Sequence, residues 1–524
     1  MYKAINKFFL TFNSHLLKEI ELSKKDPFSL QRDCFKMLIK SGGESAFGKE
    51  HNFEIIKDKD FQTQVKMFQR TVPIRDYNAF VPYINRLRGG EDYVLWNQKV
   101  RWFAKSSGTS SDKSKYIPIT PDSLYMNHYG GFKRMLTSYV GTFPKSKIFS
   151  GKALTLGGSV QPDSIPNIKA GYSAFSGDLS AILLKNSPFI AEFARTPKRE
   201  TALKSDFSQK LEAICRECSS QNITNFAGVP SWNLMLMNKI LEYTGKNNIC
   251  EVWPNIELFM HGGIGFEPYR EVYRSLFPSP NMHYLENYNA SEGYFAFQDD
   301  LSVNSMLLTV GNGIFYEFIP MDKLNEVLNG DISEIPTLEE VKTGINYALV
   351  ISSVTGLWRY LIGDCISFTS LLPHRIIITG RTQLFINAFG EELMIENAEK
   401  AIAATCKKLN CSITDFTVAP IFMNSDRETK GRHKWAIEFD ELPANINDFA
   451  KELDYQVTQQ NSDYEAKRSN NATMLPLDIV VLTKGTFYRW MQSRGKLGGQ
   501  NKVPRLYKDS RFIDQLTSQK NGNI

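Results

Sequence analysis

Two extended segments early in the chain are joined by the hydroxyl-rich loop Phe103-Ala104-Lys105-Ser106-Ser107-Gly108-Thr109-Ser110-Ser111-Asp112-Lys113-Ser114-Lys115. Such a loop offers backbone N–H groups, hydroxyl donors and positive charge together, which is what a polyphosphate needs. Val100–Phe103 is predicted as a strand, and residues 116–119 are predicted to be extended, because Pro118 keeps its predecessor out of helical geometry. The pattern therefore predicts a strand–loop–strand phosphate clasp.

The clasp differs from a Walker loop in the element that comes after it. In G-x-x-x-x-G-K-[ST] the lysine opens a helix directly, and that pattern does not occur in this sequence. The next helix is predicted only after the second strand, with Thr120 as its N-cap and Pro121 at its first position. Because Ser/Gly-rich stretches are often solvated turns, the prediction depends on partners elsewhere in the chain.

Length, charge and cysteine content limit the class of protein. A chain of 524 residues with 42% hydrophobic and 23% charged residues is ordinary for a globular protein and too long for one compact core. A net charge of +6 argues against a dedicated nucleic-acid partner, and the basic run from Arg494 to Arg511 has a solvated tail as its plainer explanation. Seven scattered cysteines do not predict a disulfide framework. With no signal peptide and no membrane-spanning apolar stretch, we expect no membrane partner and a cytoplasmic location.

The order of predicted elements indicates an α/β fold with an α+β part. Residues up to about Gly90 are predicted to be largely helical, and strands and helices alternate from Val100 onward. We expect a large N-terminal domain of several sheets (1–380) and a small C-terminal α+β domain (381–524), with the boundary at Gly380-Arg381-Thr382-Gln383. The large domain has predicted strands at 152–156, 223–226, 257–260, 282–285, 306–310, 314–319, 347–352 and 376–379, and predicted helices at 199–219, from a cap at Ser231, and at 268–276. The small domain has predicted helices at 395–409 and 446–460 and strands at 416–421, 435–439 and 479–482.

A second segment that carries chemistry is Tyr288-Asn289-Ala290-Ser291-Glu292-Gly293. An aromatic ring, a tight turn and a carboxylate suit adenine stacking beside a hard-cation site. Mg²⁺ takes one or two carboxylates plus phosphate oxygens, so a single glutamate suffices. A buried tyrosine and a helix-capping glutamate would explain the same residues structurally.

Two later segments add a carboxylate and a basic residue. Gly356-Leu357-Trp358-Arg359-Tyr360-Leu361-Ile362-Gly363-Asp364 predicts a carboxylate at a strand-end turn, where its two oxygens match a ribose diol. Thr379-Gly380-Arg381, followed by Gly390-Glu391-Glu392 and Glu396, places a basic residue at a domain junction that can act as a hinge. An ordinary Gly-Asp turn and a surface turn are the structural alternatives.

The order and spacing of these motifs are similar to the adenylate-forming superfamily of acyl-activating enzymes. The segments between them are more particular: Gly228-Val229-Pro230-Ser231-Trp232, Trp253–Phe259, His261-Gly262-Gly263 and Gly499–Arg505. They resemble the auxin-responsive Gretchen Hagen family of acyl acid–amido synthetases, in a bacterial-type member, from about Tyr77 to Arg505.

The resemblance implies a role for each motif. Asp364 would hold the ribose hydroxyls of ATP with Arg381 close by, Gly263 and Tyr288 would flank adenine, and Glu292 would bind Mg²⁺. The phosphate loop would hold the β- and γ-phosphates through Ser106, Ser107, Gly108, Thr109, Ser110 and Lys115. The implied catalytic residues are Lys115, Glu292 and Lys502, the last reaching the reacting carboxylate and the α-phosphate from a mobile lid.

The resemblance also implies a reaction in two steps. A carboxylate attacks the α-phosphorus of ATP and releases pyrophosphate, and an amine, typically of an amino acid, then displaces AMP to give an amide. No protein nucleophile is needed, since the enzyme supplies charge neutralisation and alignment.

Three departures keep alternatives open. Asp112 stands where the family usually has a second glycine, Gln383 where the superfamily often has a hinge Asp or Lys, and Asn289-Ala290 is an atypical approach to Ser291. One alternative is a ligase with coenzyme A or another thiol as acceptor. The other is a non-catalytic nucleotide-binding regulatory module, which Asp112 favours. The acid, the amine and the oligomeric state are open at this level.

Overall fold

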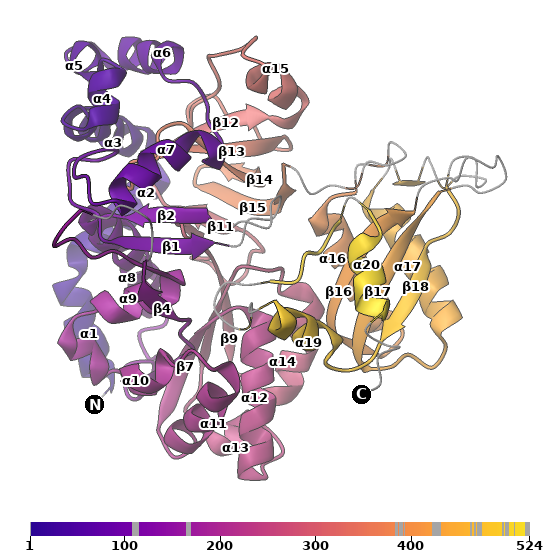
Figure 1. Cartoon of the computed structure of the whole chain (residues 1–524). Coiled ribbons are helices and arrows are strands. Elements are labelled where there is room, and N and C mark those ends of the chain that lie inside the picture. Colours follow the sequence, from indigo (N-terminus) through magenta and orange to yellow (C-terminus); the bar gives the residue numbers. More distant parts are fainter. Residues whose placement is uncertain are drawn as a thin grey trace.

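The computed structural model describes residues 2–106, 115–163, 169–382, 386, 391, 393–421, 431–461, 464–465, 468, 474–494, 497, 502–507 and 509–518. These residues form a large domain and, beside it, a smaller domain built from the C-terminal part of the chain (Figure 1). The predicted two-part α/β and α+β fold is confirmed. The predicted boundary at 380–383 stays a prediction.

A run of helices precedes the first strand, as predicted. Asp26, Asp60 and Asp76 each cap one of these helices, with a carboxylate oxygen that accepts a hydrogen bond from a backbone N–H at 3.1–3.3 Å. The helices are α1 (Tyr2–Phe12), α2 (Ser14–Lys25), α3 (Pro27–Gly42), α4 (Ala46–Glu50), α5 (Phe53–Ile56), α6 (Phe61–Thr71) and α7 (Tyr77–Arg88).

The strands on either side of the hydroxyl-rich loop pair with each other. In this antiparallel hairpin Ser106 lies opposite Lys115, and the Thr120 hydroxyl accepts a hydrogen bond from the Ser123 N–H at 3.0 Å to cap the helix that comes next. The two predicted strands and the late helix are therefore confirmed, while the loop between the strands, residues 107–114, lies outside the described residues. The elements are β1 (Trp102–Ser106), β2 (Lys115–Ile119), β4 (Val160–Pro162), β5 (Phe175–Gly177), η1 (Ser123–His128) and α8 (Tyr129–Thr142), with sheet order β2-β1-β5-β4.

The main sheet is parallel in one half and antiparallel in the other. Within the described residues its order is β12-β13-β14-β15-β11-β10-β9-β8-β7-β3-β6, and the strands from β6 to β9 run parallel. The carboxyl ends of β7, β8 and β9 therefore meet at one edge, where α/β sheets bind ligands. The strands are β3 (Lys152–Thr155), β6 (Arg195–Thr196), β7 (Ile223–Gly228), β8 (Leu258–His261), β9 (His283–Ala290), β10 (Gly293–Phe297), β11 (Met306–Leu308), β12 (Ile314–Pro320), β13 (Asn346–Ser353), β14 (Tyr360–Leu371) and β15 (His374–Arg381).

Two predicted helices differ from those observed. The helix predicted at 199–219 is divided, because Asp206 leaves helical geometry and caps the second half by accepting from the Gln209 N–H at 2.8 Å. The helix predicted to start from a cap at Ser231 begins at Pro230, with Val229 in the cap position, since proline suits the first helical turn. The helices here are α9 (Leu179–Asn186), η2 (Phe189–Glu192), α10 (Arg199–Ala202), α11 (Phe207–Cys218), α12 (Pro230–Thr244), α13 (Ile249–Val252), η3 (Glu267–Tyr269), α14 (Arg270–Leu276), η4 (Met321–Lys323) and α15 (Leu324–Leu328).

The strand-end turn predicted for Asp364 is wrong. Asp364 lies inside β14, where it is paired with Arg381 of β15, and Gly363 beside it has a φ of 92°. The register against β13 shifts between Leu361 and Cys365, so Gly363 serves an irregularity inside the ladder. Strand β10 was also not predicted.

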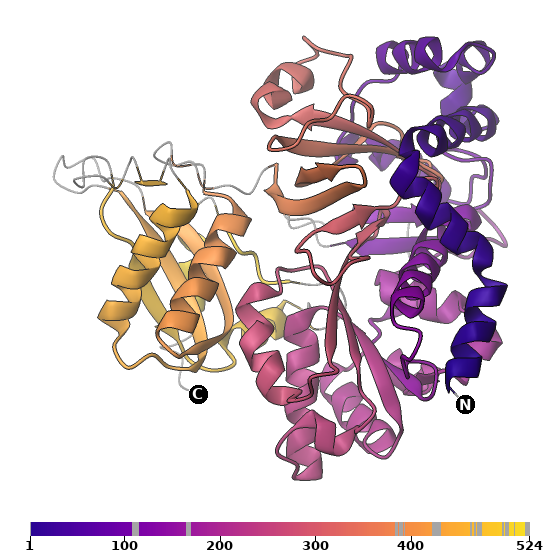
Figure 2. The same cartoon turned by 180° about the vertical axis from the view of Figure 1, so that it is seen from behind.

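The small domain has the predicted α+β pattern. Its sheet has the order β16-β17-β18, and helices α16 and α17 cover one face, which Figure 2 shows from their side, while α20 lies on the other face in Figure 1. The elements are α16 (Ile395–Lys408), β16 (Ser412–Ile421), β17 (Arg432–Glu441), α17 (Ile446–Gln460), β18 (Asp478–Leu482), α19 (Thr486–Ser493) and α20 (Arg511–Ser518). Among the described helices of either domain, none has the length and apolar character to cross a membrane.

Candidate active site

Three of the predicted site residues meet through their side chains. The Tyr288 hydroxyl donates a hydrogen bond to Asp364 Oδ2 at 2.5 Å, and Arg381 Nε lies 3.1 Å from Asp364 Oδ1. The sheet brings them together, because Asp364 and Arg381 are cross-strand partners in β14 and β15. The result is a carboxylate that is held on two sides and remains partly exposed.

The ring of Tyr288 belongs to the core of the large domain. It is buried and packs against Phe295, with 4.7 Å between ring centroids. Burial and the neighbouring Asp364 carboxylate hold the pKa of Tyr288 well above its usual value, so the hydroxyl keeps its proton as a donor. The structure thus shows Tyr288 orienting Asp364, and its predicted contact with adenine stays a prediction.

Glu292 lies in the turn between β9 and β10, where polar atoms are buried without partners. Burial raises the pKa of its carboxyl, which the Lys115 amine partly opposes and Asp364 reinforces. The hydroxyls of Ser291 and Tyr360 are buried, and neither has a hydrogen-bond partner among the described residues. A buried carboxylate beside unpartnered oxygens fits a hard cation that completes its shell with phosphate oxygens and water. In the described part of the chain, no group of three His, Cys, Asp or Glu side chains could hold a metal by itself.

The clasp reaches this turn through Lys115. This residue opens β2, its Nζ lies 5.8 Å from the Tyr77 ring centroid, and its charge acts on Glu292. Ser106 ends β1 opposite Lys115. The other predicted phosphate-loop residues, Ser107, Gly108, Thr109 and Ser110, lie outside the described residues, as do Asp112 and Gln383.

Lys502 comes to the same place from the small domain. A Cβ atom on Gly263 would lie 3.2 Å from Lys502 Nζ, so this glycine, with a φ of 88°, leaves room for the lysine. Lys502 keeps contact with solvent, but the protein atoms crowded around its amine lower its pKa to about 8. The carboxylates of Asp364, Glu399 and Glu292 oppose that shift, which places the amine within electrostatic reach of both domains' acidic groups.

The contact between the domains uses residues that sequence reasoning missed. Glu399 of α16 accepts a hydrogen bond from the Gly265 N–H at 3.3 Å and pairs with Arg505 at 3.8 Å. Arg505 also donates to the Tyr269 hydroxyl at 3.0 Å, and Tyr269 donates to the Thr414 carbonyl at 3.3 Å. Arg505 is 6% exposed, so a solvated tail does not describe it. Its place at the end of the Gly499–Arg505 motif was the one signal available.

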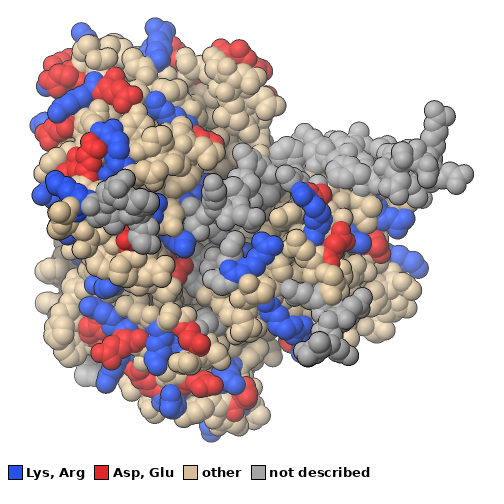
Figure 3. Space-filling view, in the orientation of Figure 1, with Lys and Arg blue, Asp and Glu red and all other residues tan. Residues whose placement is uncertain are grey.

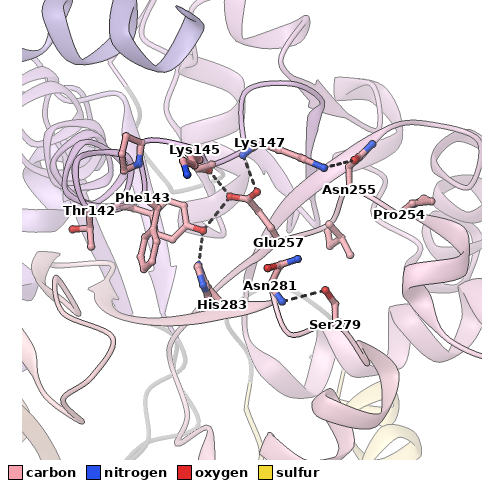
Figure 4. A pocket seen from close by; sticks show the side chains of 14 residues that line it. Thr142, Phe143, Lys145, Lys147, Pro254, Asn255, Glu257, Ser279, Asn281 and His283 are labelled. Atoms are coloured by element: carbon pink, nitrogen blue, oxygen red, sulfur yellow. Dashed lines mark hydrogen bonds between the residues drawn. The ribbon is translucent and has the colours of Figure 1, made fainter. Parts of the chain in front are cut away.

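A separate hollow lies at the other edge of the parallel strands (Figure 4). It has a volume of about 450 Å³, and Glu257 and His283 stand where β8 and β9 begin. Glu257 accepts from the Tyr139 hydroxyl at 3.1 Å and the Lys147 N–H at 2.7 Å, and Tyr139 contacts His283 Nδ1 at 2.8 Å. None of the predicted site residues that the structure describes lines this hollow. The bonds of Tyr139 with Glu257 and His283 tie α8 to the strands.

The fold of the whole chain has counterparts among solved structures. The chain superposes on the GH3.15 acyl acid amido synthetase with a TM-score of 0.74 at 16% identity, covering 96% of this chain and 95% of the other. It also matches a 2-hydroxyisobutyryl-CoA ligase in the postadenylation state, with a TM-score of 0.58 at 11% identity over 94% and 92% of the two chains. The fold is therefore that of the adenylate-forming enzymes, with their separate C-terminal domain.

Within this class the family is defined by sequence. The GH3 family N-terminal domain matches residues 16–282, the central domain 307–381 and the C-terminal domain 396–511. The chain therefore belongs to the GH3 family, as the resemblance to the auxin-responsive Gretchen Hagen acyl acid–amido synthetases predicted. Among relatives, the 4-substituted benzoates–glutamate ligase GH3.12 of Arabidopsis thaliana is 24% identical over 86% of this chain and 89% of its own, and the jasmonoyl–L-amino acid synthetase JAR6 of Nicotiana attenuata is 23% identical over 96% and 95%.

Proposed function

We propose that this protein adenylates a carboxylic acid with ATP and Mg²⁺ and then transfers the acyl group to the amine of an amino acid. It is an AMP-forming carbon–nitrogen ligase of the acyl acid–amido synthetase class. The observation that supports the proposal most strongly is the convergence of Asp364, Glu292, Lys115 and Lys502, which come from four separate segments and both domains. A regulatory module without chemistry would have no need of the lysine from the small domain.

The nucleotide's ribose is assigned to Asp364. Its two oxygens match two hydroxyls, and Tyr288 and Arg381 fix the carboxylate before the ligand arrives. Adenine is assigned to a position flanked by Gly263 and Tyr288, as the family resemblance implies. Because the positioning contacts already exist, little ordering is required on binding.

The phosphates are assigned to the clasp and Glu292. Lys115 and the loop that begins at Ser106 would hold the β- and γ-phosphates, and Glu292 would bind Mg²⁺, with the unpartnered Ser291 and Tyr360 hydroxyls nearby. When bound, Mg²⁺ supplies charge neutralisation of the phosphate oxygens. Lys115 contributes a second positive charge on the same side.

Lys502 is assigned to the first chemical step. The acid's carboxylate oxygen forms a bond to the α-phosphorus while the bond to pyrophosphate breaks, so two anions must approach each other. With a pKa of about 8, the Lys502 amine is charged at neutral pH and would neutralise that build-up. In the second step the amine nitrogen bonds to the acyl carbon, AMP leaves, and the nitrogen gives up a proton.

A thiol acceptor is the second candidate, because the adenylating half of the reaction is the same. The fold shared with a CoA ligase is the observation that favours it.

Basic and acidic side chains are interspersed over the face in Figure 3, which supports neither a nucleic-acid nor a membrane partner. We propose a cytoplasmic location.

The test is pyrophosphate release from ATP and Mg²⁺ over a panel of carboxylic acids, without and then with amino acids. Acid-dependent release that yields an amide would establish the ligase and name its substrates, and Lys502→Ala should lose it. If pyrophosphate is released and the acyl group forms a thioester with coenzyme A but no amide with an amino acid, the second candidate would be favoured. No ATP binding would overturn adenylation.

A further inference from the structure

Helix α16 of the small domain ends in a motif that brings two cysteines together. The helix ends at Lys408, the Leu409 N–H donates to the Thr405 carbonyl at 3.0 Å, and Asn410 takes a left-handed conformation with a φ of 48°. The Cys411 N–H then donates to the Cys406 carbonyl at 3.1 Å. This pattern is a Schellman motif, in which the side chains at the positions of Cys406 and Cys411 commonly contact each other.

The backbone geometry is compatible with a bond between the two sulfurs. Cysteines whose Cα atoms are more than about 7 Å apart cannot be bridged without backbone movement. Here the main-chain hydrogen bond, with one or two covalent bonds at each end, keeps the two Cα atoms within about 7 Å. The Cys411 sulfur itself lies 4.0 Å from the Cys406 carbonyl oxygen. Both thiols are free.

The two thiols differ in how an oxidant can reach them. Cys411 is half-buried, whereas Cys406 is buried behind it. The hydrogen bond from the Cys406 thiol lowers the pKa of Cys411, which favours the reactive thiolate. Burial raises the pKa of the thiols of Cys34, Cys215, Cys218, Cys250 and Cys365. Cys411 is therefore the reactive sulfur, and Cys406 is its natural partner.

We propose that Cys406 and Cys411 form a reversible redox pair that closes to a disulfide in the presence of a mild disulfide oxidant such as oxidised glutathione. The Cys411 thiolate attacks a glutathione sulfur, forms a mixed disulfide and releases one glutathione thiolate. Cys406 gives its proton to solvent, attacks the Cys411 sulfur and releases the second glutathione. Two protein thiols are oxidised and one glutathione disulfide is reduced to two thiols.

The consequence is protection of a half-buried thiol just beyond the helix that contacts the large domain. A single oxidised cysteine can proceed to irreversible acids, whereas a neighbouring thiol diverts it to a disulfide that reductants restore. Because Glu399 lies on the same helix but nearly two turns away, closing the pair leaves its contact with Gly265 in place.

The experiment exposes the full-length protein to glutathione buffers of increasing oxidation, blocks free thiols, and maps tryptic peptides by mass. Trypsin cuts after Lys407 and Lys408, so a bridge joins two peptides that otherwise separate. We expect the joined peptides, with loss of two hydrogen atoms and full reversal by dithiothreitol. Reduced Cys406 and Cys411 throughout the series would overturn the proposal.

Serine variants make the test specific. In Cys406→Ser the glutathione adduct should accumulate at Cys411, because the resolving thiol is gone, and in Cys411→Ser neither adduct nor bridge should form there. Cys250→Ser is the matched control, since Cys250 is also half-buried, and it should keep the bridge. A bridge to another cysteine in place of this pair would contradict the assignment.

Discussion

Two arginine–carboxylate pairs lie close together in the antiparallel half of the main sheet, and they serve different purposes. Arg359 pairs with Glu317 in the core, where the side chains are 1% and 0% exposed. Arg381 pairs with Asp364 at the candidate site, where they are 28% and 18% exposed. One residue of each pair comes from the same short motif, since both Arg359 and Asp364 lie in the segment Gly356–Asp364. Composition alone does not distinguish them.

The two pairs differ in how many of their hydrogen-bonding groups already have a partner within the protein. The Arg359 guanidinium donates to both Glu317 oxygens and to the carbonyls of Gln69, Val72 and Ser333, at 2.7–3.2 Å. A pair that is fully satisfied inside the protein holds elements together and has nothing left for a ligand. Among the described side chains, only Tyr288 and Arg381 pair with the Asp364 carboxylate, which remains 18% exposed.

The largest expected effect is on stability, from breaking the core pair. Arg359→Met would leave the Glu317 carboxylate buried without its charge partner, which costs about 3–5 kcal/mol of unfolding free energy. Chemical denaturation followed by tryptophan fluorescence would measure it. The matched control is Arg32→Ala, which removes an exposed pair with Glu339 and should cost about 0–1 kcal/mol. Equal stability losses in the two variants would contradict the structural role.

The next largest effect is on chemistry, from the lysine that the small domain adds to the open pair. Lys502→Ala should lower the rate of pyrophosphate release by about 10²–10³-fold, because a charge aimed at the reacting anions is removed. Its unfolding midpoint should stay near that of the wild type, since the side chain keeps contact with solvent. Lys502→Arg retains the charge and should recover part of the rate. An unchanged rate in Lys502→Ala would remove this residue from the mechanism.

Breaking the open pair should affect nucleotide binding with little effect on folding. Asp364→Asn keeps the shape but loses the charge that two hydroxyls and Arg381 share, so kcat/KM for ATP should fall about 10–100-fold, chiefly through KM. Unfolding free energy should change by about 1 kcal/mol or less, because the carboxylate is partly exposed. A stability loss as large as that of Arg359→Met would show that the two pairs do not differ.

The sequence indicated some residues of the candidate site and missed the strand that carries one of them. Asp364 and Glu292 were candidates because each stands in a motif whose residue types fit one chemical task, and Lys502 was a candidate through the family resemblance. The structure brings the three residues near one another, while their roles stay predictions. The strand that carries Asp364 was missed because Gly363 and Asp364 are typical of turns. The flanking residues Leu361 and Cys365 pair with β13, and Asp364 itself pairs with Arg381 of β15, and this pairing overrides that preference.

The contact between domains was not predictable for a different reason. Glu399 is an ordinary residue of a charged helix face in sequence, and Tyr269 looks like a core aromatic. Their partners, Gly265 and Thr414, are more than a hundred residues away. Tertiary contacts of this length leave no periodicity in the sequence, so only the folded chain shows them.

The pH dependence of the reaction separates Lys502 from the carboxylates around it. The lysine is charged below its pKa of about 8 and neutral above it. For the wild type, kcat/KM for ATP should therefore fall by about tenfold per pH unit above that value. In Lys502→Arg the guanidinium stays charged, so this alkaline limb should move upward or disappear. If kcat/KM for ATP falls in the same way with rising pH in both proteins, the decrease would come from a titrating group other than Lys502.

The smallest expected effect distinguishes two roles for one tyrosine. Tyr288→Phe keeps the buried ring against Phe295 and removes only the hydrogen bond to Asp364. A hydrogen bond to a charged group contributes about 1.5–3 kcal/mol. Because Arg381 still holds the carboxylate, we expect only about 1 kcal/mol of this to be lost from ATP binding, so kcat/KM for ATP should fall about fivefold. If Tyr288 acts on adenine through its ring alone, Tyr288→Phe should match the wild type.

In the double variant Tyr288→Phe/Asp364→Asn, the loss should be smaller than the product of the two single effects, because the hydroxyl acts through the carboxylate that is already changed. Fully multiplicative losses would show that the hydroxyl contacts the nucleotide independently of the Asp364 pair.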